Sequence, residues 1–124
     1  MTLAVAGSIV AWLAALGGLT LAVYVVSRRP APRWLVWLHP AAGTTALVLL
    51  WVAFTLWPGP RDLPLDAGII ALTLAFVAGS FMFSLRATCL PVPVFAIALH
   101  ALAALSACAL LIVGLLHASL QAAG

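Results

Sequence analysis

Two histidines hold equivalent places in this 124-residue sequence, and they are the side chains best suited to chemistry. His39 and His100 lie 61 positions apart, and each follows a leucine. An imidazole nitrogen binds metal ions, and an ionisable side chain within an apolar helix usually faces the protein interior or a functional path. If the two rings face each other, the space between them suits a planar metal macrocycle with two axial ligands, and haem b is the first candidate.

The histidine pair leaves other chemistry open. The same two nitrogens would suit a metal ion such as copper or a chlorophyll-type pigment, and they would equally serve hydrogen bonds between helices in a cofactor-free protein. The third histidine, His117, has no counterpart, since its equivalent is Leu56. We expect His117 to be an interfacial residue at the far end of the last span, where contact with a partner or a quinone headgroup is a secondary hypothesis.

The histidines belong to a longer internal repeat. When the sequence is shifted by 61 positions, glycines and prolines also coincide: Gly7 with Gly68, Gly18 with Gly79, Pro30 with Pro91 and Pro32 with Pro93. These residue types are uncommon in the chain, so their coincidence indicates a duplicated unit. We expect one repeat over about 1–60 and a second over about 61–124, each a helical hairpin with one histidine.

The composition predicts an integral membrane protein. Hydrophobic residues make up 67% of the chain and charged residues 6%, which is typical of a protein that lies mostly in lipid. Four apolar runs, at roughly 3–27, 34–57, 66–86 and 92–118, are each long enough to cross the bilayer. Short separators require antiparallel neighbours. We therefore expect a single all-α domain, an antiparallel four-helix membrane bundle whose first span is retained and is not a cleaved signal peptide.

Arginines mark one edge of the predicted bundle. Arg28, Arg29, Arg33 and Arg86 all fall where spans one and three finish and spans two and four begin. By the positive-inside rule this edge is cytoplasmic. In a bacterial inner membrane, both termini and the loop with Arg61, Asp62 and Asp66 then lie on the periplasmic side. The same four arginines are candidate partners for the two propionates of a haem.

Small and aliphatic side chains surround each histidine at helical spacing. His39 has Leu35, Val36, Ala42 and Gly43 one turn away, and His100 has Ala96, Ile97, Ala103 and Ala104. Such residues leave room for a flat ring, or equally for close helix packing. The small residues of spans one and three, Gly7, Ala11, Ala14 and Gly18 with Gly68, Ala71, Ala75 and Gly79, indicate helix packing. Pro40 follows His39, so we expect span two to kink or to begin its regular helix later.

Several functions are disfavoured by what the sequence lacks. No acidic residue lies in the interior of a predicted span, because Asp66 stands at the very edge of the third, and this argues against a small proton- or cation-coupled transporter. The chain has no nucleophile constellation, no Cys-x-x-Cys motif and no phosphate loop, so we do not expect an autonomous enzyme. Its few charges make nucleic acid an implausible partner. Cys89 and Cys108 are too far apart along one helix to form a disulfide, so both are expected to be free thiols.

The Pro-x-Pro turns, the Leu-His pairs at Leu38-His39 and Leu99-His100, and the four spans together resemble bacterial membrane-bound b-type cytochromes. The resemblance is one of layout over the whole chain, and many members of such families hold two haems with four histidines, whereas this chain has one matched pair. It implies one haem b on His39 and His100, and a subunit of an oxidoreductase that passes electrons between a quinone and other redox subunits. The alternative is a cofactor-free structural or assembly subunit of a larger membrane complex, and homo-oligomers fit either function.

Overall fold

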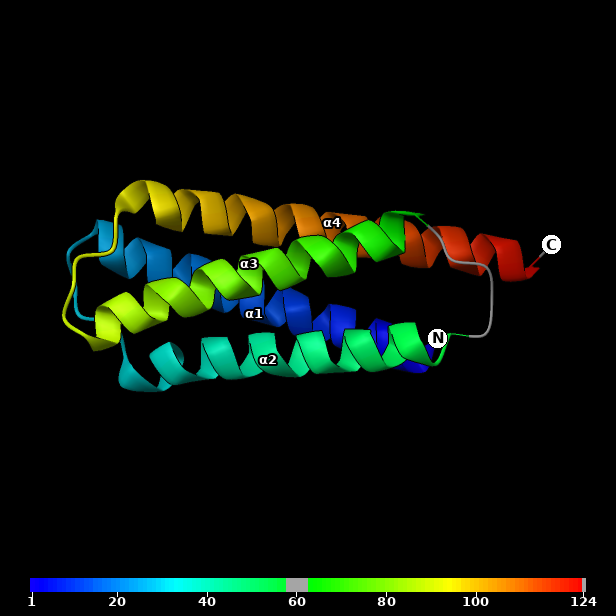
Figure 1. Cartoon of the computed structure of the whole chain (residues 1–124), viewed down its shortest axis with the longest axis horizontal. Helices are drawn as coiled ribbons and strands as arrows, with labels where there is room; N and C mark the ends of the chain where they lie inside the picture. Colours follow the sequence, from blue (N-terminus) through cyan, green and yellow to red (C-terminus); the bar gives the residue numbers. More distant parts are fainter. Residues whose placement is uncertain (58–62, 124) are drawn as a thin grey trace.

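The four apolar segments form four helices, which confirms the predicted fold class (Figure 1). The computed structural model describes residues 1–57 and 63–123, with side chains placed as far as Gln121. Helix α1 spans Thr2–Val26, α2 spans Arg33–Thr55, α3 spans Leu63–Ala87 and α4 spans Val94–Ala123. Each is long and apolar enough to cross a membrane, as expected for a multi-pass protein.

Several helix bounds differ from the expected ones. Helix α3 begins at Leu63, so Asp66 lies in its first turn and not in the preceding loop. A carboxylate is favoured there by the helix dipole, and Pro64 is tolerated because first-turn N–H groups have no partner within the helix. Helix α4 continues to Ala123. Helix α2 begins at Arg33 and runs through Pro40, which removes one hydrogen-bond donor without ending the helix. Arg61 and Asp62 lie outside the described residues.

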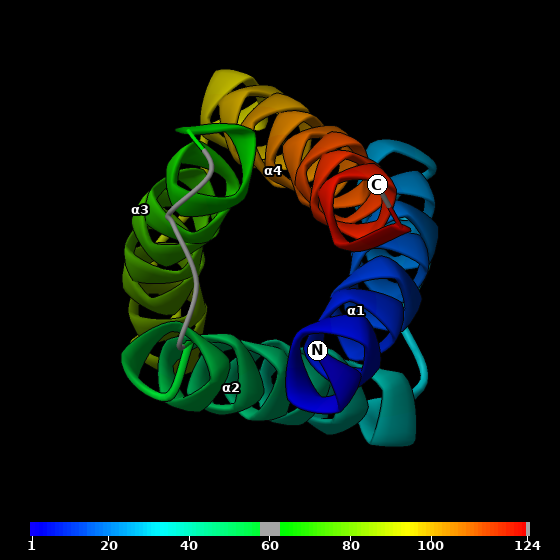
Figure 2. The ribbon, with the colours of Figure 1, turned by 90° about the vertical axis from the view of Figure 1, so that its right-hand side faces the viewer.

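The helices run antiparallel around a common axis. The two turns at 27–32 and 88–93 lie at one end of the bundle, and both termini lie at the other (Figure 1). We call the first the arginine end, because Arg28, Arg29, Arg33 and Arg86 lie there. Viewed along the axis, α2 and α4 occupy diagonal corners, as do α1 and α3 (Figure 2). Packing is most extensive within the hairpins α1–α2 and α3–α4 and thinner between them.

The tightly packed core lies toward the terminal end of the bundle. A cluster of buried side chains there combines all four helices: Ala11, Ala46, Leu50, Leu65, Ile69, Cys108 and Leu111. In the half toward the arginine end, Leu35 is the one buried residue among 15–45, and none is buried among 76–106. The two halves of the bundle are therefore packed to different degrees, and the histidines lie in the looser half.

Glycine on one helix receives a large side chain from its partner, and both hairpins use the same arrangement. A Cβ atom added at Gly7 would lie 2.8 Å from Cγ of Leu50, and one added at Gly68 would lie 3.1 Å from Cγ of Leu111. The absent methyl group lets the backbones approach closely, which is how apolar helices pack in lipid. The small residues expected to pack do so at these positions.

The outward faces carry exposed apolar side chains, as a bilayer environment requires. Leu74, Phe81, Leu102 and Leu116 are each 60–65% exposed. In water such a surface would be a strong association site, whereas lipid chains solvate it. Polar hydroxyls on the spans bond to their own helix, as Thr20 does to the carbonyl of Leu16 and Thr44 to that of Pro40.

The two arginine-end turns open with the same backbone motif. After α1, Arg28 has φ 53° and Arg29 donates its N–H to the carbonyl of Tyr24; after α3, Cys89 has φ 57° and Leu90 donates to Leu85. This is the Schellman arrangement, in which the residue after the helix cap is left-handed and is usually glycine. The repeat therefore extends to backbone conformation, although neither left-handed residue is glycine.

The close approach of α4 to α3 at Gly114 predicts an unequal response to alanine. A Cβ there would lie 2.7 Å from the backbone nitrogen of Leu65, which has no room to move, whereas a Cβ at Gly43 would meet nothing closer than 3.9 Å. We expect Gly114→Ala to lower the free energy of unfolding in detergent by about 1–3 kcal/mol. The control Gly43→Ala should leave it unchanged or raise it by up to about 1 kcal/mol. Equal effects would contradict the packing.

Relief of the left-handed backbone at Cys89 should stabilise the second turn. Glycine removes the Cβ clash at positive φ, which costs roughly 1–2 kcal/mol, against a smaller gain in unfolded-chain entropy. We expect Cys89→Gly to raise the free energy of unfolding by about 0.5–1 kcal/mol, measured by denaturant titration in detergent. Cys89→Ala keeps the strain and serves as the control. Stabilisation by alanine equal to that by glycine would assign the effect to loss of the thiol.

Candidate functional site: the paired histidines

His39 lies on α2 and reaches across to the backbone of α1. It is the seventh residue of its helix, and its Nδ1 lies 2.8 Å from the carbonyl oxygen of Ala14. Gly18, one turn beyond Ala14, makes this contact possible, since a Cβ there would lie 2.7 Å from Cε1 of the ring. Ala14 thus provides the hydrogen-bond acceptor for His39, and Gly18 leaves the space that the ring occupies.

His100 repeats this arrangement in the second hairpin. It is the seventh residue of α4, its Nδ1 lies 2.9 Å from the carbonyl oxygen of Ala75, and a Cβ at Gly79 would lie 2.8 Å from its Cε1. A backbone carbonyl oxygen has two lone pairs, so it accepts this bond in addition to the one within its own helix. Each histidine therefore receives its hydrogen-bond partner from its own hairpin.

These bonds determine where each ring carries its hydrogen. A carbonyl oxygen only accepts hydrogen bonds, so Nδ1 of both His39 and His100 must donate. In a neutral imidazole the other nitrogen, Nε2, then carries a lone pair. No hydrogen bond to either Nε2 occurs within residues 1–57 and 63–123. Both neutral rings are thus set in the tautomer with hydrogen on Nδ1 and a lone pair on Nε2.

The two rings meet across the bundle. Helices α2 and α4, which carry them, stand at diagonal corners (Figure 2), yet the ring centroids of His39 and His100 are 6.2 Å apart with an angle of 87° between ring planes. Both side chains are partly buried. The juxtaposition expected from the repeat is present in the structure.

The surroundings of the pair are apolar and mostly only partly buried. Leu35 is buried and lies 3.7 Å from the Cβ position of Gly17, and Gly43 faces Phe76 of α3. The other neighbours, Val36, Ala42, Ala96, Ile97, Ala103 and Ala104, are all only partly buried or small. The rings therefore lie among aliphatic and small side chains, in the half of the bundle that has fewer buried residues.

The arginines share the arginine end but not one direction. Arg86 lies in the last turn of α3, seven residues after Gly79, so it is on the face that meets His100. Arg33 opens α2, and Arg28 and Arg29 lie in the first turn between helices. Arg29 lines a hollow on the outer side of α1, away from the pair. Among the described residues, none of the four forms an ion pair, and none forms a hydrogen bond with His39 or His100.

Other candidate side chains stand apart from the pair. His117 lies 17 residues beyond His100 on the same helix, about 25 Å along it. Cys89 is exposed in a turn, Cys108 is buried in the core, and both are free thiols as expected. No cluster of three or more His, Cys, Asp or Glu side chains suited to a metal ion occurs in the described part of the chain.

The residues that orient the rings were not identified as site residues from the sequence. The acceptors are backbone carbonyls, and any residue type supplies one, so Ala14 and Ala75 carry no signal. Gly18 and Gly79 do carry one: a glycine lies 21 positions before a histidine in both repeats. That spacing in an antiparallel hairpin with a short turn places glycine opposite histidine.

Comparisons with protein-family models, with curated protein sequences and with solved structures find no match to this chain. The site must therefore be interpreted from its own geometry.

Alanine substitution at two adjacent glycines should show whether His39 depends on the space that Gly18 leaves, or whether any loss of glycine from α1 has the same effect. Gly18→Ala places Cβ 2.7 Å from Cε1 of His39, whereas Gly17→Ala makes only ordinary contacts at 3.7 Å and beyond. We expect Gly18→Ala to break the bond to Ala14, which is worth about 1 kcal/mol, and to mix the two tautomers of His39. Nitrogen NMR of labelled histidine measures this directly. Unchanged His39 signals in Gly18→Ala, or equal changes in Gly17→Ala, would contradict it.

Proposed function

We propose that this chain is a b-type electron-transfer subunit that holds one haem between His39 and His100. The observation that carries the proposal is the pair of diagonal rings, 6.2 Å apart, each with Nδ1 bonded to a backbone carbonyl. That arrangement leaves two Nε2 lone pairs available at one depth in an apolar bundle. Haem iron, when bound, supplies one-electron chemistry by changing between its ferrous and ferric states.

The separation of the rings supports a single ion between them. A metal–imidazole bond is about 2 Å long and the bonding nitrogen lies about 1 Å from the ring centre, so two axial imidazoles have centres about 6 Å apart. The 6.2 Å between the ring centroids is close to that value, which applies where both Nε2 atoms face the ion.

The ligand count favours a haem over an ion bound by protein alone. Structural and catalytic zinc sites use three or four protein ligands, and the described residues bring together no such group. A tetrapyrrole supplies four nitrogens of its own, so two histidines complete its iron. A copper ion would leave ligand positions for groups that the chain does not provide nearby.

The hydrogen bonds behind the rings support a ligand role as well. Metal-binding histidines usually donate their second ring N–H to a carbonyl or carboxylate, which fixes the ring orientation and raises ligand basicity. Ala14 and Ala75 provide this bond for His39 and His100. Arg86, on the same face of α3 as Gly79, is the arginine best placed to pair with a propionate.

The membrane setting follows from the same proposal. Four spans with the arginines at one end fit a bacterial inner membrane with that end in the cytoplasm and both termini in the periplasm. A quinone or another redox subunit is the partner class that we propose, because a haem held within the spans would exchange electrons with a carrier in or beside the membrane. His117, at the terminal end, remains a candidate contact for such a partner.

A second candidate function is a cofactor-free structural subunit. The observation that favours it is that both histidines already satisfy one nitrogen through bonds between helices, which is a packing role in itself. A pigment-binding subunit would use the same nitrogens. Visible spectroscopy separates these candidates from the haem protein.

The test is the absorption spectrum of protein purified from cells well supplied with haem. We expect a Soret band that sharpens on dithionite reduction, and its loss by more than tenfold in either His39→Ala or His100→Ala, because each variant removes an axial ligand. His117→Ala, the matched control, should retain the band. Magnetic circular dichroism should report two nitrogen ligands.

Three results would overturn the haem proposal. The first is a colourless preparation from haem-replete cells with wild-type helicity. The second is full haem retention in the double variant His39→Ala with His100→Ala, and the third is green absorbance, which would assign a pigment. Conservative variants His39→Gln and His100→Gln keep a hydrogen-bonding side chain and guard against simple misfolding.

A further inference from the structure

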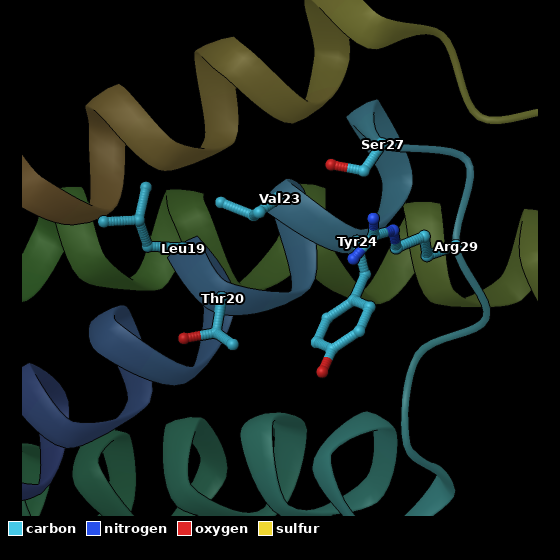
Figure 3. A pocket seen from close by; sticks show the side chains of 6 residues that line it. All are labelled: Leu19, Thr20, Val23, Tyr24, Ser27 and Arg29. Atoms are coloured by element: carbon cyan, nitrogen blue, oxygen red, sulfur yellow. The ribbon is translucent and has the colours of Figure 1, made fainter.

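A hollow of about 420 Å³ lies on the outer side of α1 near the arginine end (Figure 3). It is lined by Leu19, Thr20, Val23, Tyr24, Ser27 and Arg29. Leu19 and Val23 are 49% and 59% exposed, so the hollow opens toward the bilayer and not toward the histidines. It combines an apolar wall at span depth with polar groups at the end of the helix.

The backbone motif that ends α1 brings Arg29 into this hollow. Arg28 is left-handed, Arg28 donates its N–H to the carbonyl of Val25 at 3.1 Å, and Arg29 donates to Tyr24 at 3.0 Å. A Schellman ending places the side chain of the second residue past the cap against that of the third residue from the helix end. Figure 3 shows the result: the Arg29 side chain runs back along α1, with its guanidinium over the helix near Tyr24.

The second hairpin provides an internal reference. Its turn has the same ending, with Cys89 left-handed and Leu90 donating to Leu85 at 2.8 Å. The positions equivalent to Tyr24 and Arg29 are thus Leu85 and Leu90, the apolar pair that usually accompanies this motif. The first hairpin replaces that pair with a phenol and a cation, although packing alone favours leucines.

The polar groups of the hollow have unused donors. Thr20 donates to its own helix at the carbonyl of Leu16, but the hydroxyls of Tyr24 and Ser27 make no hydrogen bond with the described residues, and Arg29 has no acidic partner among them. A guanidinium presents five N–H donors in a plane and pairs strongly with phosphate. The donors are therefore set for an anion at the level where a span meets the membrane surface.

We propose that this hollow binds the headgroup phosphate of an anionic phospholipid, with an acyl chain along Leu19 and Val23. Arg29 forms the charged contact, Tyr24 and Ser27 donate to the phosphate or glycerol oxygens, and the nearby Arg28 adds positive charge that favours an anionic over a zwitterionic lipid. This proposal does not depend on haem binding, because the hollow and the histidine pair lie on different sides of α1.

The experiment compares lipids retained by the full chain. Protein reconstituted with equal phosphatidylglycerol and phosphatidylcholine is analysed by native mass spectrometry after mild delipidation. We expect one phosphatidylglycerol to be retained preferentially, and Arg29→Gln to weaken its retention about tenfold, as loss of a charged hydrogen bond worth about 1.5 kcal/mol implies. Arg33→Gln, an exposed arginine at the same end, is the matched control and should change retention less than twofold.

A built site in the second hairpin provides an independent arm. Leu85→Tyr with Leu90→Arg copies the phenol and cation onto the equivalent backbone motif, and we expect a second retained phosphatidylglycerol. If Arg29→Gln and Arg33→Gln lowered phosphatidylglycerol retention equally, the cause would be general surface charge, and the proposed site would be wrong. Equal retention of phosphatidylcholine would also overturn the site, as would displacement of the lipid by millimolar inorganic phosphate, which would assign a free-anion site. Circular dichroism confirms that each variant is folded.

Discussion

An imidazole inside an apolar bundle needs a hydrogen-bond partner, because lipid supplies none. The structure meets this constraint with backbone alone: a carbonyl on the neighbouring helix accepts from Nδ1, and a glycine one turn further leaves the ring room to reach it. The rest follows from that contact. It fixes the spacing within each hairpin, the tautomer of each ring and the direction in which Nε2 is left available.

In each hairpin, the first helix carries two glycines, and the second helix packs one large side chain against each of them. Gly7 and Gly18 on α1 receive Leu50 and His39 from α2, and the second hairpin does the same with its own residues. The leucine contact lies in the tightly packed end and the histidine contact in the loosely packed one. Stability and a potential site are thus separated along the bundle, so the looser half does not compromise the packed one.

Much of this architecture is predictable from the sequence. The four spans follow from apolar runs of sufficient length, and the meeting of His39 and His100 follows from the repeat, because equal depth and equal helix faces converge on one axis. Other features are not predictable in this way. The start of α3 at Leu63 depends on Pro64 and Asp66 both suiting a first helical turn, and the carbonyls of Ala14 and Ala75 belong to a backbone that every residue shares.

The direction of the Arg29 side chain, back along α1, is also not predictable from the sequence, because an arginine beside a turn ordinarily indicates only membrane topology. Only the backbone hydrogen bond to Tyr24 shows which way the side chain must leave the turn. The sequence comparison of the two repeats held part of this information, in that Leu85 and Leu90 replace the tyrosine and the arginine.

Because each hairpin supplies the hydrogen bond to its own histidine, a single chain carries two copies of one histidine arrangement in parallel orientation. A dimer of two identical hairpins, related by an axis along the bundle, would bring the same two histidine rings together. Joining the hairpins in one polypeptide therefore adds no contact between the histidines. What the covalent link adds is freedom for the halves to differ. Pro40 follows one histidine where Ala101 follows the other, and a tyrosine and an arginine face lipid on one side only. A symmetric dimer has to apply every substitution twice, whereas this chain can specialise one half while the other keeps the original geometry.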